Sequence, residues 1–146
     1  MFLINTDVLS ALRRRERSPD VARWISGQRP TDLYLSAVSV GEIEQEIARQ
    51  RRRDPQFAET LAAWLDSVLA LYGERVLAVD TSTARRWGRL CATLGHDGVD
   101  LLIAATALEH GLTVVTRNVR HFEPTGVPVV DPSGRAPRKR NADSTA

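Results

Sequence analysis

The amino-acid sequence predicts an α/β protein, a three-layer sandwich in which helices cover both faces of a parallel sheet of four or five short strands. Two observations lead to this class. Short apolar runs alternate with helical patterns along most of the 146 residues. In addition, the stretch from Asp97 to Asn118, DGVDLLIAATALEHGLTVVTRN, contains a helix, a glycine of the kind that ends helices, and a β-branched strand. A short strand that is apolar throughout is typical of a parallel sheet covered on both faces.

The remaining elements are predicted from the spacing of apolar residues, which differs between helices and strands. Strands are expected at residues 2–4, 33–35, 76–79, 112–115 and 127–130, the last being an edge strand flanked by prolines. Helices are expected at residues 8–15, 20–27, 39–53, 54–72, 81–94 and 101–110. Ser39 and Glu42 have the spacing of a capping box at the start of the third helix. We expect one domain over residues 1–132, followed by a basic disordered tail over residues 133–146.

The composition is that of an ordinary soluble protein, with 42% hydrophobic and 26% charged residues. Cys91 is the only cysteine, which excludes a disulfide within the chain and favours a reducing compartment. No run approaches the roughly 18 apolar residues of a membrane span, and the N-terminal sequence lacks the basic region and cleavage site of a signal peptide. We therefore expect a cytoplasmic protein with no membrane partner.

Positive charge is concentrated in a few places along the chain. The last twelve residues carry four basic side chains and one acidic side chain, which leaves residues 1–134 with a net charge of −1. Within the expected domain, arginines gather in the runs Arg13–Arg17 and Arg49–Arg53. The guanidinium group pairs bidentately with phosphate oxygens, so both runs are candidate phosphate-binding surfaces. The alternative is that each run is a solvated helix face.

Polar side chains follow the predicted strands or open the predicted helices at several places. They are Asn5 and Asp7 after the first strand, Glu42 in the third helix, Asp97 and Asp100 before the sixth helix, and Thr116 and Asn118 after the fourth strand. In a parallel α/β sheet, the carboxyl ends of the strands and the N-termini of the helices share one edge. Carboxylates gathered there need a cation, and their hard oxygen atoms favour Mg²⁺ or Mn²⁺. Such an ion orients water for attack on a phosphodiester.

Each of these residues also has a structural alternative. Glu42 can complete the capping box with Ser39, and residues 5–7 can cap the first helix. Asp97 and Asp100 can cap the helix that follows them, because acids in a first turn interact favourably with the helix dipole. The joint placement of the residues at one edge favours a metal site over separate caps.

Four blocks of the sequence, in this order and spacing, resemble the PIN-domain ribonucleases, and among them the VapC-type toxins of bacterial toxin–antitoxin pairs. The blocks are FLINTDVLSALRR, LYLSAVSVGEIE, DLLIAATALEHGLTVVTRN and VRHFEPTGV, and the resemblance extends from residue 1 to about residue 132. It implies a Mg²⁺- or Mn²⁺-dependent endoribonuclease that cleaves tRNA, rRNA or mRNA. It also implies a homodimer that is silenced by a VapB-type antitoxin covering the acidic pocket.

The resemblance assigns roles to individual residues. The second acid of the family falls on Glu42, the third on Asp100, and the fourth position on Asn118, with Thr116 as its polar neighbour. The first block departs from the family pattern D-T-N, because this chain has Asn5 in place of the first carboxylate and Asp7 in place of the amide. An amide oxygen can bind a hard cation, but it brings no negative charge and cannot act as a base.

The predicted metal ligands are therefore Asn5, Glu42 and Asp100, and Asp7 restores the missing charge if it turns towards the ion. The catalytic set adds Thr116 and Asn118. The predicted RNA-binding residues are Arg13, Arg14, Arg15, Arg51 and Arg52.

Two functions remain open at this point. The first is a metal-dependent ribonuclease toxin. The second is a catalytically weakened module that binds RNA or its antitoxin, because Asn5 replaces the usual first acid. A receiver-type phosphotransfer domain is set aside, since that chemistry needs a lysine near the acids and the only lysine is Lys139 in the tail.

Overall fold

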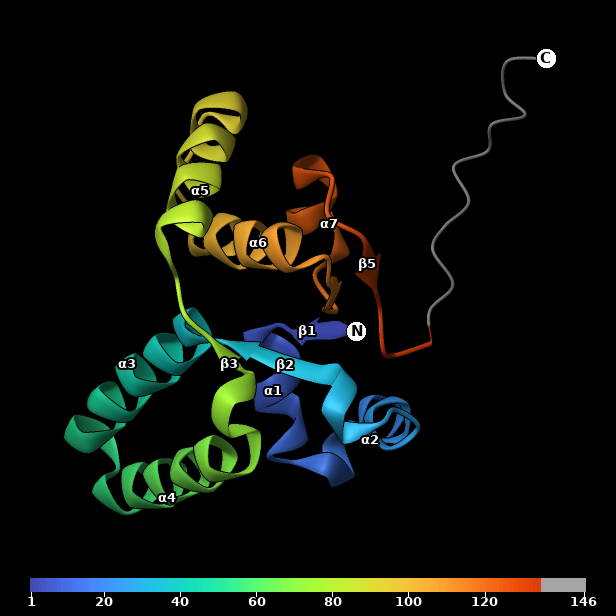
Figure 1. Ribbon diagram of the computed structural model, residues 1–146. Helices are drawn as coiled ribbons and strands as arrows, with labels where there is room; N and C mark the ends of the chain where they lie inside the picture. Colours follow the sequence, from blue (N-terminus) through green and yellow to red (C-terminus); the bar gives the residue numbers. More distant parts are fainter. Residues whose placement is uncertain (135–146) are drawn as a thin grey trace.

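The computed structural model describes residues 1–134, which form an α/β sandwich around a five-stranded parallel sheet of order β3-β2-β1-β4-β5 (Figure 1). The strands are β1 (Phe2–Ile4), β2 (Leu33–Ser36), β3 (Val76–Leu77), β4 (Thr113–Val115) and β5 (Val129–Val130). The predicted class, the parallel sheet and the edge position of the last strand are confirmed. From residue 135 on, the predicted tail lies outside the described residues.

The helices lie on both faces of the sheet, with α1 to α4 on one side and α5 to α7 on the other (Figure 1). They are α1 (Thr6–Leu12), α2 (Pro19–Ser26), α3 (Ala37–Arg53), α4 (Pro55–Tyr72), α5 (Thr81–Leu94), α6 (Val99–His110) and α7 (Val119–Phe122). Short 3-10 turns cover η1 (Arg15–Arg17), η2 (Pro30–Asp32), η3 (Gly73–Arg75) and η4 (Glu123–Thr125). Within residues 1–134, no helix is long and apolar enough to cross a membrane.

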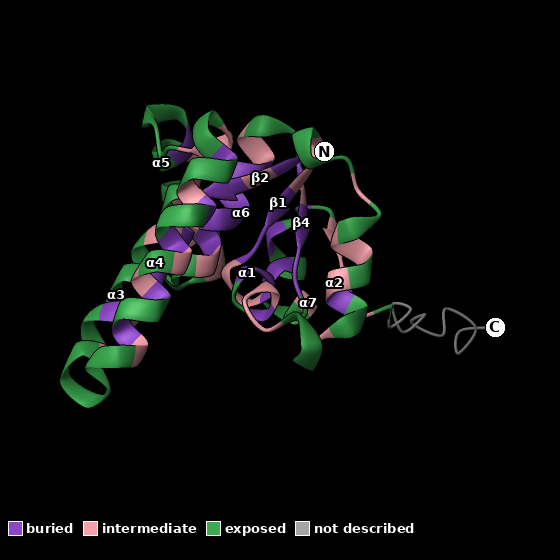
Figure 2. Cartoon of the chain, turned by 90° about the horizontal axis from the view of Figure 1, so that it is seen from below, coloured by how far each residue is buried: buried purple, intermediate pink, exposed green. Residues whose placement is uncertain are grey.

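The central strands are buried on both faces because consecutive side chains point in opposite directions. Ile4 and Val115 belong to the core formed with α1 to α4, whereas Leu3 and Val114 belong to the core formed with α6 and α7. All four side chains are fully buried, and the middle of the sheet is correspondingly purple in Figure 2. This explains why the strands are short, continuous apolar runs in the sequence.

The start of α3 differs from the prediction. Ser36 is the N-cap, and its Oγ accepts a hydrogen bond of 3.1 Å from the backbone N–H of Val38. Ser39 lies inside the first turn and is fully buried, so the predicted capping box between Ser39 and Glu42 is wrong. The helix begins directly at the end of β2, and this position leaves the Glu42 side chain free for another partner.

Two further differences concern short elements. The first helix ends at Leu12 instead of residue 15, because the backbone leaves helical geometry at Arg14, which has a φ of −126° and a ψ of 67°. Helix α7, a single turn after Asn118, has no counterpart in the prediction. It is too short to produce a helical period in the sequence, and Phe122 holds it in the core.

The order of the strands defines where a ligand site is expected. From β1 the sheet grows through β2 and β3 in one direction, and then through β4 and β5 in the other. Ligands of open α/β sheets bind in the crevice outside the carboxyl ends of the strands at such a reversal. Here the crevice lies beyond β1 and β4, where Asn5 and Thr116 directly follow the two strands.

Candidate active site

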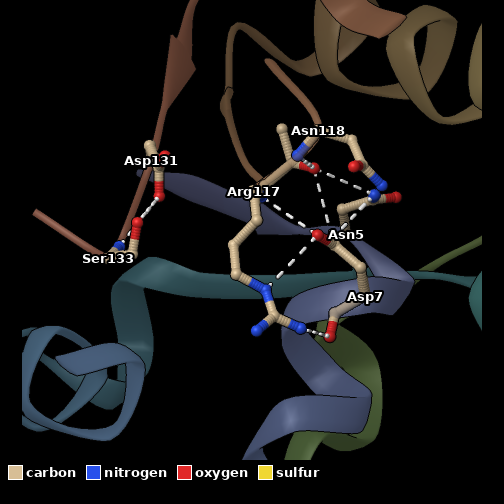
Figure 3. Close-up of polar contacts among 7 residues, drawn as sticks. Asn5, Asp7, Arg117, Asn118, Asp131 and Ser133 are labelled. Carbon is tan, nitrogen blue, oxygen red and sulfur yellow. Dashed lines mark hydrogen bonds and ion pairs between the residues drawn. The ribbon is translucent and has the colours of Figure 1, made fainter. Parts of the chain in front are cut away.

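Asn5 is the centre of a hydrogen-bonded network at the carboxyl end of β1 (Figure 3). Its Nδ2 donates to Asp7 Oδ1 at 2.9 Å and to Thr116 Oγ1 at 3.2 Å. A carboxylate can only accept hydrogen bonds, so the contact with Asp7 identifies the nitrogen side of the Asn5 amide. The Thr116 hydroxyl donates to Asp7 Oδ1 at 3.2 Å and accepts from the backbone N–H of Asn118 at 3.0 Å. The network therefore joins the residues that follow β1 to those that follow β4.

The other end of the Asn5 amide is unsatisfied. Asn5 is 4% exposed, and its Oδ1 is buried without a hydrogen-bond partner among the described residues. Leaving a buried acceptor unpaired costs about 1–3 kcal/mol, so such atoms are uncommon in folded proteins. This oxygen is therefore an unused acceptor at the carboxyl end of β1.

Asp7 is bound to the loop that follows β4. Its Oδ2 accepts a hydrogen bond of 3.0 Å from the backbone N–H of Arg117, and the Arg117 Nε lies 3.9 Å from the same oxygen (Figure 3). Its Oδ1 is already bonded to Asn5 and Thr116. In this conformation the charge of Asp7 is balanced by Arg117, and both carboxylate oxygens have protein partners.

Glu42 reaches the same edge through Thr6. The Thr6 Oγ1 lies 2.7 Å from Glu42 Oε1 and 2.7 Å from the buried Ser39 Oγ. Thr6 has one hydroxyl proton and the carboxylate can only accept, so Thr6 donates to Glu42 and accepts from Ser39. This chain of hydroxyl groups orients Glu42 beside the residue that follows Asn5, and it leaves Oε2 without a hydrogen bond from residues 1–134.

Asp100 lies in the first turn of α6 and is bonded to α7. Its Oδ2 lies 2.9 Å from the Nδ1 of His121. The backbone N–H of His121 donates to the carbonyl of Asn118 at 3.1 Å, which attaches Asp100 to the loop that carries the other site residues. Asp97 is exposed in the preceding loop, and the N-cap of α6 is Gly98, so the sequence-based alternative of an acidic cap by Asp97 is wrong.

The predicted ligands fit a hard divalent cation by their chemistry. They are two carboxylates, Glu42 and Asp100, and the unpartnered amide oxygen of Asn5. Within residues 1–134, no group of three or more histidine, cysteine, aspartate or glutamate side chains is arranged to hold a metal, and the predicted set itself contains only two carboxylates. Mg²⁺ is commonly bound through one or two carboxylates, with water and substrate phosphate completing its shell. The residues present therefore suit Mg²⁺ or Mn²⁺.

The arginine runs begin at a distance from this edge. Arg51 and Arg52 are exposed in the last turn of α3, about 14 Å beyond Glu42 along the helix axis, where α3 projects from the sheet (Figure 2). Arg13, Arg14 and Arg15 follow the end of α1. Burial of the Arg13 guanidinium, with a smaller contribution from neighbouring arginines, lowers its pKa.

Three residues of this network received no site role from the sequence: Thr6, Arg117 and His121. Thr6 and Arg117 stand inside the very motifs that supplied Asn5 and Thr116, and His121 lies one helical turn after Asn118. The sequence therefore shows where these residues lie along the chain. It does not predict their hydrogen-bond partners, because residue spacing does not determine the direction of a side chain in a loop.

Known proteins resemble this chain in both sequence and fold. The PIN domain family model matches residues 2–126. A VapC ribonuclease, Y4jK of Sinorhizobium fredii, is 33% identical over 139 residues, covering 90% of this chain and 97% of the relative. Toxin FitB of Neisseria gonorrhoeae is 31% identical over 139 residues, covering 90% of this chain and 98% of the relative. The crystal structure of FitAcB from Neisseria gonorrhoeae matches with a TM-score of 0.80 and 31% identity, covering 90% of this chain and 98% of that one.

A parallel sheet with polar residues gathered at its carboxyl edge, together with these matches, shows that the chain belongs to the PIN-domain family. Its curated relatives place it, within that family, among the VapC-type toxins of toxin–antitoxin pairs. The resemblance drawn from the four sequence blocks is confirmed.

Proposed function

We propose that this protein is a Mg²⁺- or Mn²⁺-dependent endoribonuclease, the toxin of a toxin–antitoxin pair. The observation that carries the proposal is the buried Oδ1 of Asn5, which has no partner among residues 1–134 and belongs to the residue that follows β1, where the strand order reverses. Glu42 is bonded to Thr6 after β1, Asp100 is bonded to His121 after β4, and each has one carboxylate oxygen without a hydrogen bond from residues 1–134. The ribonuclease relative supports RNA as the substrate.

Each side chain of the proposed metal site has a separate role. Glu42 and Asp100 supply negative charge for the ion, and Asn5 supplies a neutral third ligand. When bound, the ion would orient water for attack and offset the charge that develops on the phosphodiester. Arg117, whose side chain is 44% exposed, can pair with a phosphate of the substrate while it balances Asp7.

One observation favours a second candidate, a weakened module that binds RNA or its antitoxin. The position of the first acid holds an amide, and the nearest carboxylate, Asp7, is already paired with Arg117. The candidate metal site then has two negative charges instead of three, which weakens its affinity for a divalent cation.

A cleavage assay separates the two candidates. Purified protein is incubated with a structured RNA and Mg²⁺ or Mn²⁺, with EDTA as the metal-free control. The wild-type chain is expected to cleave, and Asp100→Ala is expected to abolish cleavage because it removes a charged ligand. If the wild type does not cleave and only the Asn5→Asp variant does, the result supports the weakened module. If Asp100→Ala cleaves as fast as the wild type, the site assignment is wrong.

We also propose that a VapB-type antitoxin covers this toxin, and that the toxin is a homodimer. The crystal structure of FitAcB and the relative called Toxin FitB support a protein partner. A groove of about 870 Å³ between α1, α2 and α4 offers a surface for such a partner. It is lined by apolar side chains with arginines among them, including Leu12, Ile25, Trp64, Leu71, Arg15 and Arg75. Leu71 is 71% exposed, which suits an apolar segment of the partner. The arginines of the lining suit acidic residues on either side of that segment.

A further inference from the structure

We propose that His121 is a positioning residue that fixes the Asp100 carboxylate, so that Oδ2 is held by the imidazole and Oδ1 remains as the ligand atom for the divalent cation. The inference rests on the proposed function, because it assigns a role towards the same metal site. Its basis is the distance of 2.9 Å between His121 Nδ1 and Asp100 Oδ2.

Both members of the pair are carried by firmly held elements. Asp100 opens α6, whose side chains Leu101 and Ile103 are completely buried. His121 precedes Phe122, which is also completely buried and holds α7 in the core. Both side chains therefore extend from backbone that is anchored in the core.

The chemistry of the contact determines which atoms remain free. A carboxylate oxygen only accepts, so Nδ1 carries the proton and donates it to Oδ2. Oδ1 of Asp100 then has no hydrogen bond from the described residues. Glu42 has the same arrangement, with Oε1 held by Thr6 and Oε2 free. Hydrogen-bond donors that hold ligating carboxylates in this way typically account for about 10–100-fold in metal affinity.

An ordinary surface ion pair is the competing explanation. The side chains of His121 and Asp100 are 63% and 34% exposed, and exposed pairs contribute only about 0–1 kcal/mol to stability. A surface pair would leave metal affinity unchanged when His121 is replaced. A positioning residue changes metal affinity while the stability of the fold stays nearly the same.

The experiment measures Mn²⁺ binding to the RNA-free protein by isothermal titration calorimetry. Asn carries its amide nitrogen at the position of Nδ1, whereas Gln carries it at the position of Nε2. We expect His121→Ala and His121→Gln to weaken Mn²⁺ affinity about tenfold or more. We expect His121→Asn to retain most of the wild-type affinity. His110→Asn, at an exposed histidine at the end of α6, is the matched control and should bind as the wild type does.

A second measurement reports the contact without the metal. Side-chain ¹⁵N NMR of His121 is expected to show a proton on Nδ1, and Asp100→Asn should change that signal. If all His121 variants bind Mn²⁺ with wild-type affinity, or if His121→Asn is as weak as His121→Ala, the positioning role is overturned while the proposed function stands. If the wild type binds no Mn²⁺, the proposed metal dependence fails and the inference fails with it.

Discussion

The exchange of Asn5 and Asp7 relative to the family pattern D-T-N places a hydrogen-bond donor at position 5 and a carboxylate acceptor at position 7. Asn5 donates to Asp7 at 2.9 Å, so one donor still meets one acceptor. The negative charge, however, moves from position 5 to position 7, where Arg117 balances it. The exchange thereby removes one charge from the candidate metal site.

Reversing the exchange tests this explanation. Asn5→Asp alone places two carboxylates where the structure has one hydrogen bond, and we expect it to lower the free energy of unfolding by about 1–3 kcal/mol at pH 7. The double variant Asn5→Asp/Asp7→Asn restores one donor and one acceptor. Its stability should return towards the wild-type value, and its Mn²⁺ affinity should exceed that of the wild type.

Urea unfolding and calorimetric titration of the four proteins in this cycle, including Asp7→Asn, provide the measurement. An Asn5→Asp variant as stable as the wild type would show that the two side chains are not coupled. A double variant with unchanged Mn²⁺ affinity would show that the carboxylate at position 5 is not a ligand.

At the scale of elements, the sequence predicts what depends on local pattern and misses what depends on tertiary contact. Helix α6 and strand β4 were predictable because α6 is largely apolar and a glycine, Gly111, separates it from β4. In the structure Gly111 has a φ of 65°, which is the left-handed conformation expected there. The N-cap of α3 could not be predicted, because Ser36 and Ser39 are both good N-cap residues. Only the position at which β2 ends selects Ser36. The parallel sheet predicted that Asn5 and Thr116 share one edge. It did not predict that His121 would be the partner of Asp100.

The groove between α1, α2 and α4 gives a prediction at this scale. Leu71→Glu puts a charge on its apolar lining, and we expect it to weaken binding of the proposed VapB-type antitoxin at least about tenfold, since a buried unpaired charge is costly. RNA cleavage should not change, because Leu71 is outside the crevice. Ala70→Glu, exposed on the same helix but outside the groove, is the matched control. Equal antitoxin binding by both variants would exclude the groove as the partner surface.

At the scale of the whole molecule, charge is divided between the acidic crevice and the basic helix ends. Residues 1–134 carry a net charge of −1, so attraction of RNA depends on where the arginines lie. Arg51 and Arg52 are exposed on the projecting end of α3, at a distance from the crevice that an RNA strand of several nucleotides can span. The sequence located these runs but not their distance from the acids, because helix direction and length set that distance.

Salt dependence tests whether this projecting end binds RNA. Replacing Arg51 and Arg52 with alanine should reduce the slope of log affinity against log salt by about 1.4, which corresponds to two lost contacts with single-stranded phosphate. The matched control replaces Arg85 and Arg89, which are exposed on α5. Filter binding of a fixed RNA at several salt concentrations gives the slopes. If the Arg51 and Arg52 variant keeps the wild-type slope, that run is a solvated helix face.

The central claim is that Asn5, Glu42 and Asp100 hold one divalent cation at the carboxyl ends of β1 and β4. The most direct test is a titration of ¹⁵N-labelled protein with substoichiometric Mn²⁺, observed by NMR, because the paramagnetic ion broadens the signals of nuclei near it. We expect the side-chain amide of Asn5 and the backbone signals of Glu42, Asp100 and Thr116 to broaden first, and Asp100→Ala to abolish the effect. Broadening that is centred on another surface, or that persists in Asp100→Ala, would contradict the claim.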